Sequence, residues 1–354
     1  MKKHLRATAL GLALLMMLLT GCQAAPAATT TPPVKDLVIF TWADYLPADI
    51  LDEFMKESGV NVVYTYFESN EEMLTKLQSS DGAQYDLVLA SDYIIDLARE
   101  QNLAQKLDKS KIPNFGDIDP VMQGQYYDET NEYTVPFAAG TPLIVYDPAR
   151  VSIDIKGYND LWNPALKDSI VIMDDMRNVM GITLKSMGQS FNVTDPAIIK
   201  AAGEKLMGLK DNIRVFDYNE PHMKMIAGET TVGYMFTPQV LWALSERPDL
   251  KVVYPQEGMG FGIDSFFIPS KAPNPDAAHK FLEFVLRGEI SARLSEWTQY
   301  INCVSTAKAF MPEEVLSSEV LYIPSEILGD AEFIENIGAE ATTLFDAEWI
   351  KFKQ

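Results

Sequence analysis

Aromatic, hydroxyl and acidic side chains follow two apolar segments of the sequence, at the points where expected strands end. Those that follow segments 37–40 and 85–90 are Trp42, Asp44, Tyr45, Ser91 and Tyr93. In an open parallel sheet the carboxyl ends of the strands share one edge, and ligands bind beyond that edge. We therefore expect these side chains to form part of a ligand-binding site. Two alternatives stay open, because Trp42 could pack in the core and Ser91 could cap the helix that follows it.

The sequence carries none of the common signatures of catalysis. It has no Gly-x-Ser-x-Gly elbow, no His-Glu-x-x-His helix and no phosphate-binding loop. The adjacent carboxylates of Asp174 and Asp175 could act as acid and base, but adjacent residues seldom face one substrate together. The pattern favours a binding protein that is not an enzyme, and an extracytoplasmic hydrolase is kept as an alternative.

The elements that must position these residues are those of an α/β protein. The first are a strand at 37–40, a helix at 47–59, a strand at 60–67, a helix opened by a capping box at 69–72, and a strand at 85–90. Because strands alternate with helices, the order predicts a parallel sheet covered by helices. A second α/β unit is expected to follow. Its strand candidates lie at 143–146, 170–173, 213–216 and 231–235, before a further strand at 265–268 and a helix capped by Asn274.

The N-terminal segment has the layout of an export signal. Three basic residues precede an apolar run at 9–19, which is too short to span a bilayer with margin. The following Leu19-Thr-Gly-Cys22 resembles a bacterial lipobox, which implies cleavage before Cys22 and lipid on its sulfur. We therefore expect a signal peptide at 1–21 and an extracytoplasmic protein anchored to the cell membrane, at the cell surface or in a periplasm. An ordinary secretory signal is the alternative.

Composition narrows the classes of partner. The net charge is −21, and removal of 1–21, with three basic and no acidic residues, would make it −24. Such a chain repels phosphates, so we expect no nucleic-acid partner. The uncharged Ala/Pro/Thr-rich stretch within 22–34 predicts a flexible linker. The rest of the chain, 47% hydrophobic overall, is long enough for two domains.

The few cysteines and histidines argue against a disulfide or a zinc site. Cys22 and Cys303 are the two cysteines of the sequence. If Cys22 carries lipid, Cys303 is left alone, and we expect it to be a small core residue. With His222 and His279 the remaining histidines of the mature chain, a Cys/His zinc site cannot be assembled. We expect no metal and no cofactor.

Several short motifs resemble those of extracellular spermidine/putrescine-binding proteins. They are 40–46 (Phe-Thr-Trp-Ala-Asp-Tyr-Leu), 66–70 (Tyr-Phe-Glu-Ser-Asn), 85–93 (Tyr-Asp-Leu-Val-Leu-Ala-Ser-Asp-Tyr), 108–111, 160–164, Asp174-Asp175 with Arg177, and 262–265 (Gly-Ile-Asp-Ser). The similarity runs from about Leu37 to near the C-terminus. It implies the type II periplasmic-binding-protein fold, in which two α/β lobes with mixed sheets flanked by helices trap a ligand between them. A hinge of crossover strands joins the lobes.

The resemblance also implies the boundaries of the lobes. The first lobe would comprise 35–139 and 263–308, and the second 144–257 and 313–354. The crossovers would lie near 139–143, 258–262 and 309–312. Taken without the resemblance, the residues predict a boundary near Gly140 but not the return of the chain to the first lobe.

A polyamine is a methylene chain that carries ammonium groups, so its site needs carboxylates for the charges and flat apolar walls for the chain. The resemblance implies these ligand-binding residues: Trp42, Asp44, Tyr45, Ser91, Tyr93, Asp175, Phe236, Asp264 and Tyr300. Asp264 could instead be a turn or cap residue, Asp175 could pair with Arg177, and Tyr300 could pack in the core. The carboxylates should dominate recognition, since a buried charge pair is worth more than a cation over a ring.

Five positions depart from the family pattern. They are Ala43, Asn178, Phe236, Gly262 and Ile334. Asn178 stands where glutamate is frequent, and Gly262 stands where a second tryptophan would cover the methylene chain. The slot thus loses a charge and an aromatic plate, which puts spermidine itself in doubt. A shorter diamine, or another cationic or amine-bearing solute, becomes credible.

The resemblance implies a transport receptor that captures an amine and hands it to the permease of an ABC importer. We expect a monomer with three partners: the small cationic amine, the permease, and the membrane through the lipid on Cys22. A sensor that binds the same ligand but docks on a membrane receptor is a second alternative, which the sequence does not decide.

Overall fold

The computed structural model describes residues 36–321, 323, 327 and 331–354. The expected signal peptide, Cys22 and the expected linker lie outside the described residues. Within the described part of the chain, no helix combines the length and apolar character needed to cross a membrane.

The first sheet is built around the β-α-β-α-β unit predicted from the sequence. Its strands are β1 (Leu37–Trp42), β2 (Val62–Phe67), β3 (Leu87–Ser91), β4 (Thr134–Gly140), β10 (Gly260–Phe267), β11 (Ile301–Asn302) and β12 (Glu332–Phe333). The spatial order is β11-β4-β10-β3-β1-β2, and β12 pairs with β10. Strand β1 is parallel to β2 and β3, which confirms the predicted parallel core. Strand β10 runs antiparallel to both β3 and β4, so the sheet is mixed.

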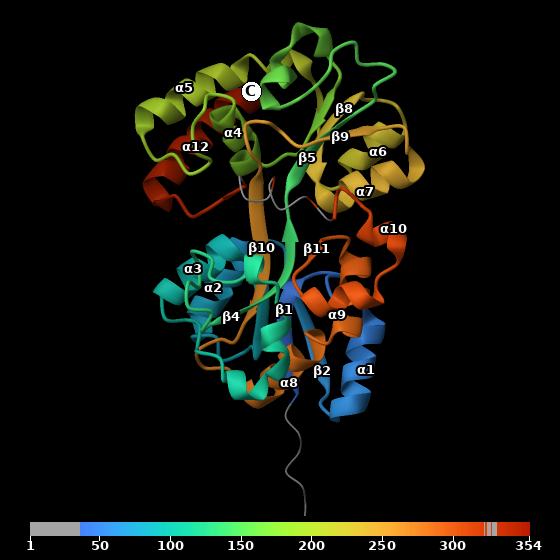
Figure 1. Cartoon of the computed structure of the whole chain (residues 1–354). Coiled ribbons are helices and arrows are strands. Elements are labelled where there is room, and N and C mark those ends of the chain that lie inside the picture. The colour runs from blue at the N-terminus through green and yellow to red at the C-terminus, as the bar shows by residue number, and fades with distance from the viewer. Residues whose placement is uncertain (1–35, 322, 324–326, 328–330) are drawn as a thin grey trace, which may run out of the picture. The chain divides into compact units, whose positions relative to one another are not determined.

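Helices flank the first sheet, as Figure 1 shows for α1, α2, α3, α8 and α9. Their bounds are α1 (Ala48–Ser58), α2 (Asn70–Ser80), α3 (Asp92–Glu100), α8 (Pro275–Val285) and α9 (Gly288–Thr298). Local signals in the sequence fix several of their ends. Gly59 ends α1 in the left-handed conformation that glycine tolerates, at φ 69°. The side chains of Ser69 and Asn274 cap α2 and α8, as the sequence predicts.

The second sheet carries the strands predicted for the second α/β unit. Its strands are β5 (Pro142–Tyr146), β6 (Ile170–Ile172), β7 (Ile213–Phe216), β8 (Val232–Phe236) and β9 (Lys251–Val253), in the order β7-β6-β8-β5-β9. Strand β6 is parallel to β7 and β8, whereas β5 is antiparallel to β8 and β9. The helices here are α4 (Met176–Lys185), α5 (Pro196–Met207), α6 (Pro221–Ile226), α7 (Thr237–Glu246) and α12 (Gly338–Lys353).

Short elements complete the described chain. They are α10 (Glu313–Leu316) and the 3₁₀ turns η1 (Lys109–Lys111), η2 (Pro113–Asp117), η3 (Pro120–Met122), η4 (Tyr158–Trp162), η5 (Pro164–Leu166), η6 (Lys210–Asn212) and η7 (Ser305–Phe310).

The chain passes between the two sheets at more than one point. It leaves the first sheet at the end of β4 and enters the second at β5, and it returns from β9 to β10. After β12 it enters α12, whose Phe345 and Phe352 are buried in the core of the second sheet. The exact lobe boundaries given above stay a prediction.

The core of the first sheet is rich in phenylalanine. The ring of Phe281 on α8 lies edge-on to Phe54 of α1 at 5.0 Å and to Phe266 of β10 at 6.0 Å. All three side chains are buried. Cys303 is buried among these residues as a free thiol, and burial raises its pKa, so the prediction of a small core residue is confirmed.

Candidate ligand-binding site

Asp264 lies where three segments of the first sheet meet. It sits on β10 opposite Ser91 at the end of β3, at a point where the register between β10 and β4 shifts. Such a bulge re-aims a side chain. The carboxylate accepts a hydrogen bond from the Tyr45 hydroxyl at 2.5 Å on Oδ2 and one from the Ser91 hydroxyl at 2.9 Å on Oδ1. Residues predicted from three separate motifs therefore meet on one carboxylate.

This carboxylate has hydroxyl partners but no cationic partner. Among the described residues, Asp264 forms no ion pair with a lysine, arginine or histidine, and its hydrogen-bond partners are Tyr45 and Ser91. Burial raises the pKa of Asp264, and the two hydroxyl donors offset only part of that rise. A carboxylate taken out of water is costly unless a positive charge compensates it. Asp264 is therefore a carboxyl whose charge has no positive partner among the described residues.

Ser91 acts through its hydroxyl on Asp264 and not on the helix that follows. It is the residue before α3, but its side chain makes no cap hydrogen bond. The alternative that its side chain caps α3 is therefore wrong, because the hydroxyl donates to the carboxylate of Asp264 instead. The amide of Asn70, at the start of α2, donates to the hydroxyls of both Ser91 and Tyr93 at 3.2 Å. Tyr93 in turn donates to Glu71 at 3.0 Å.

Aromatic rings line the same region. Tyr45 contacts Trp42 with ring centroids 5.3 Å apart and Tyr300 with centroids 6.3 Å apart. Trp42 is half-buried and also packs edge-on against the buried Phe67 at 4.9 Å. Trp42 therefore packs partly against the core, through Phe67, and partly against Tyr45. Burial raises the pKa values of Tyr45 and Tyr300, and the charge on Asp264 adds to both rises.

A second carboxyl, Asp92, supports the site from inside the fold. It accepts backbone hydrogen bonds from Tyr93 at 2.7 Å and from Ile263 at 3.1 Å, and so ties the start of α3 to β10 beside Asp264. Burial raises the pKa of Asp92 to about 8, against the pull of these two N–H donors. Sequence reasoning did not single out Asp92.

The structure does not bring Asp44 into this network. Asp44 is exposed and adopts a left-handed backbone conformation with φ 55°. Its backbone carbonyl accepts a hydrogen bond from the indole of Trp297 at 2.7 Å, while its carboxylate has no hydrogen bond or ion pair among the described residues. A role for Asp44 in ligand binding stays a prediction.

Asp175, the predicted second carboxylate, lies directly before α4. It caps α4 by accepting a hydrogen bond from the backbone N–H of Asn178 at 2.8 Å, and burial raises its pKa. Among the described residues no close ion pair joins Asp175 to Arg177, but the positive charge of Arg177 acts on Asp175 and opposes the rise that burial causes in its pKa. The guanidinium of Arg177 donates to the side chain of Asn192 at 3.1 Å and to the backbone carbonyl of Glu335 at 3.0 Å. The neighbouring Asp174 pairs with Lys353 at 2.9 Å.

Phe236 and Tyr218 form the aromatic side contributed by the second sheet. Phe236 ends β8 and is half-buried, and the Tyr218 ring lies edge-on to it with centroids 6.1 Å apart. The charges of Asp175 and Asp264 both contribute to raising the pKa of Tyr218 to about 12, behind the larger effect of burial. Sequence reasoning missed Tyr218. The signal was available, because Tyr218 follows the predicted strand at 213–216 as Trp42 follows the strand at 37–40.

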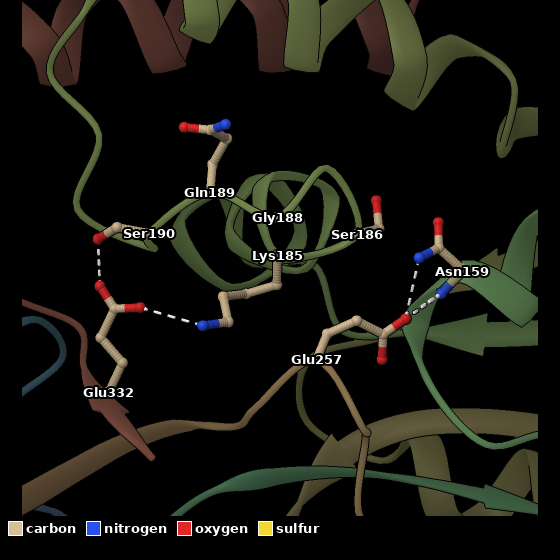
Figure 2. Close-up of a pocket in the computed structure, with 8 residues that line it drawn as sticks. All are labelled: Asn159, Lys185, Ser186, Gly188, Gln189, Ser190, Glu257 and Glu332. Carbon is tan, nitrogen blue, oxygen red and sulfur yellow. Dashed lines mark hydrogen bonds and ion pairs between the residues drawn. The ribbon is translucent and has the colours of Figure 1, made fainter. Parts of the chain in front are cut away.

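A separate pocket of about 500 Å³ lies apart from these residues. Figure 2 shows its lining, with Lys185 aimed at Glu332 and Asn159 beside Glu257. Lys185 and Glu332 form an ion pair at 3.3 Å, and Glu257 accepts hydrogen bonds from the backbone N–H groups of Tyr158 and Asn159. In this pocket Lys185 compensates Glu332, whereas Glu257 is held by N–H donors of Tyr158 and Asn159.

Comparison with known proteins gives the family. The model of the bacterial extracellular solute-binding proteins matches residues 49–319. The chain belongs to this family. It is 34% identical over 318 residues to the spermidine/putrescine-binding periplasmic protein of Salmonella typhimurium, which covers 90% of this chain and 91% of that protein.

Solved structures of this family share the fold. The substrate-binding protein of a spermidine/putrescine ABC transporter from Streptococcus pneumoniae is 31% identical, with a TM-score of 0.82 over 90% of this chain and 98% of that one. A lipoprotein of Treponema pallidum, Tp0655, is 27% identical, with a TM-score of 0.80 over 89% of this chain and 98% of that one. The predicted fold class, the type II periplasmic-binding-protein fold, is thereby confirmed.

The raised pKa of Asp264 gives this solute-binding protein a testable pH dependence. Because the folded-state pKa lies above the unfolded value, the carboxyl contributes stability below the unfolded pKa and loses it as pH rises through the folded pKa. Asparagine does not ionise, so Asp264→Asn should become more stable relative to wild type as pH rises above the ordinary aspartate pKa of about 4. Urea unfolding of ligand-free protein measures this difference.

The exposed Asp168, which pairs with Arg214 at 2.8 Å, gives the control variant Asp168→Asn. No growth of the Asp264→Asn difference with pH, or growth in the opposite direction, would contradict the expected origin of the shift.

Proposed function

We propose that this chain is the receptor of an ABC importer that captures a polyamine such as putrescine between two lobes and delivers it to a membrane permease. The observation that carries the proposal is the Asp264 carboxylate, which is half-buried, held by the hydroxyls of Tyr45 and Ser91, and without a cationic partner among the described residues. An ammonium group supplies the missing charge and can donate several hydrogen bonds.

The two carboxylates suit a ligand with charge at both ends. One ammonium group binds Asp264 on β10, and the second lies toward Asp175 at the start of α4. The methylene segment between them passes the rings of Trp42, Tyr45, Tyr300 and Phe236, where a cation over an aromatic face gains about 0.5–2 kcal/mol. Because groups on both sheets contact one ligand, binding favours the closed arrangement of the lobes.

A diamine fits the charges better than a triamine. The residue that follows Asp175 by one helical turn is Asn178, which is neutral and buried, and its side-chain oxygen has no hydrogen-bond partner among the described residues. A neutral acceptor at this position accepts an N–H but does not compensate a third charge. Another cationic or amine-bearing solute is the second candidate ligand. The neutral side chain of Asn178 favours it as well, because its oxygen can accept a hydrogen bond without requiring a further positive charge. A ligand sensor and a hydrolase remain alternatives for the use of the site.

The N-terminal motif and the relatives support a proposed anchor and location. The lipobox-like motif that ends at Cys22 supports a lipid-anchored extracytoplasmic protein. The Tp0655 relative is described as a lipoprotein, and the Salmonella relative as periplasmic. We propose that the protein works as a monomer and uses no cofactor.

Titration calorimetry of the mature protein, purified in detergent, tests the ligand. Putrescine, cadaverine and spermidine form one series, and glycine betaine and neutral amino acids form the comparison series. We expect heat of binding with at least one di- or triamine and none with the neutral amino acids. Silence with every cationic amine would refute the amine assignment, and turnover of the bound compound would favour the hydrolase.

A further inference from the structure

The side chain of Tyr218 stands at the surface although the segment that carries it is firmly held. Tyr218 lies between β7 and α6, and 48% of it is exposed. Its ring contacts Phe236, at the end of β8, in an edge-on arrangement. A large aromatic side chain left half open beside a cluster of acidic and aromatic residues has a face available for a ligand.

A single buried amide fixes both aromatic residues of this side. The Gln239 side chain, 8% exposed, donates from Nε2 to the backbone carbonyl of Tyr218 at 2.8 Å and to that of Asn219 at 3.3 Å. Its Oε1 accepts a hydrogen bond from the backbone N–H of Phe236 at 3.0 Å. The rotamer of Gln239 therefore couples the segment of Tyr218 to the end of β8. Because its hydrogen bonds are made to backbone groups, its effect on the rings is one of position.

Tyr218 lies near groups from both sheets. The carboxylates of Asp175, before α4, and Asp264, on β10, both raise its pKa, after the larger effect of burial. With a pKa of about 12 the phenol is neutral at physiological pH, so it does not compensate either carboxylate. A neutral ring close to two carboxylates suits the uncharged middle of a molecule that has a positive charge at each end.

We propose that Tyr218 is a ligand-contacting residue that covers the methylene segment of a bound amine, that Gln239 is the residue that positions it, and that Tyr218 sets the length of amine accepted. This inference rests on the proposed capture of an amine. The ring face contacts methylene groups and attracts the adjacent ammonium. The distance from the ring to each carboxylate limits how many methylene groups fit between the two charges.

Calorimetry of the mature protein with putrescine, cadaverine and spermidine tests the role of Tyr218. Tyr218→Ala should weaken the binding of the best-bound amine about three- to tenfold. It should also change the ratio of affinities among the three amines by at least about threefold. Tyr218→Phe, which keeps the ring, should stay within about twofold of wild type. Trp242→Ala is the matched control, because Trp242 is an aromatic residue of α7 with 43% exposure whose ring is tilted against that of His222.

The outcomes separate this inference from the proposed function. If wild type binds an amine but Tyr218→Ala binds every amine as wild type or Trp242→Ala does, the inference fails and the proposed function stands. If wild type binds no amine, both fail. If Tyr218→Ala weakens the binding of all three amines by the same factor, Tyr218 contacts the ligand but does not set the length of amine that is accepted.

The positioning role of Gln239 needs a double-mutant cycle. Gln239→Met has similar size and removes all three hydrogen bonds. Gln239→Met should weaken amine binding severalfold when Tyr218 is present and much less in the Tyr218→Ala background, because Gln239 acts by positioning the Tyr218 ring. Equal effects in both backgrounds overturn the positioning role. The melting temperature of each variant is measured as well, and Gln239→Glu, which keeps the acceptor for Phe236 and loses the donor to Tyr218, replaces Gln239→Met if that variant does not fold.

Discussion

Replacing Asp264 with asparagine should weaken amine binding at least about thirtyfold, which corresponds to about 2 kcal/mol. Asparagine has nearly the same shape and keeps an oxygen that can accept a hydrogen bond from Tyr45 or Ser91. What it lacks is the charge that compensates the ammonium group. Removing one partner of a buried, hydrogen-bonded charge pair costs about 2–5 kcal/mol, because the other charge is left without compensation.

Calorimetry at neutral pH measures this loss, with Asp168→Asn as the control for a carboxylate on the exposed surface of the second sheet. The melting temperature of ligand-free Asp264→Asn should equal or exceed that of wild type, since burial already disfavours the charged carboxylate. Reduced affinity together with reduced stability would point to a folding defect. Unchanged affinity would remove Asp264 from the site.

The first half of the fold was predictable from the sequence because its signals are local. Each strand from β1 to β3 is an apolar run, and the helices between them carry their own ends, such as Gly59 after α1 and Ser69 before α2. The parallel pairing then follows from the alternation of strand and helix. These predictions needed no knowledge of distant residues.

The return of the chain from the second sheet to the first was not predictable in this way. Strand β10 spans Gly260–Phe267, whereas the apolar pattern alone marked only 265–268. The two residues of β12 pair with β10 through contacts that no local pattern encodes. Local patterns could not predict this return, because the pairing partner of β10 is set by tertiary packing and not by propensity. The return was expected only from the family resemblance.

In the candidate site, too, some residues were marked by local sequence patterns and others were brought in by tertiary packing. The residues after β1 and β3 were marked by their position at strand ends, and Tyr45 and Ser91 do reach Asp264, which is 219 and 173 positions away in the chain. Ser91 also shows the limit of local reasoning. The residue type predicts a helix cap, yet the charged acceptor on β10 takes the hydroxyl, since hydrogen bonds to charged groups are stronger than those to neutral ones.

Asp175→Asn should weaken amine binding at least about tenfold while leaving the stability of the protein nearly unchanged. Asp175 has two roles that this substitution separates. As a cap it accepts a hydrogen bond from the backbone N–H of Asn178, and asparagine caps helices about as well as aspartate does. As a binding group it supplies a half-buried negative charge, which asparagine does not have.

Asp175→Ala completes the argument, because alanine removes the cap as well as the charge. It should weaken binding as Asp175→Asn does and in addition lower the free energy of unfolding by about 1 kcal/mol. If Asp175→Asn binds every amine as wild type does while Asp175→Ala is destabilised, then Asp175 is only a cap, and the second charge of a diamine must lie elsewhere. Parallel losses of affinity in the two variants, with a loss of stability in the alanine variant alone, instead place one ammonium group at the start of α4. In that case a single ligand is held by carboxylates from both sheets, which is the condition for binding to drive closure.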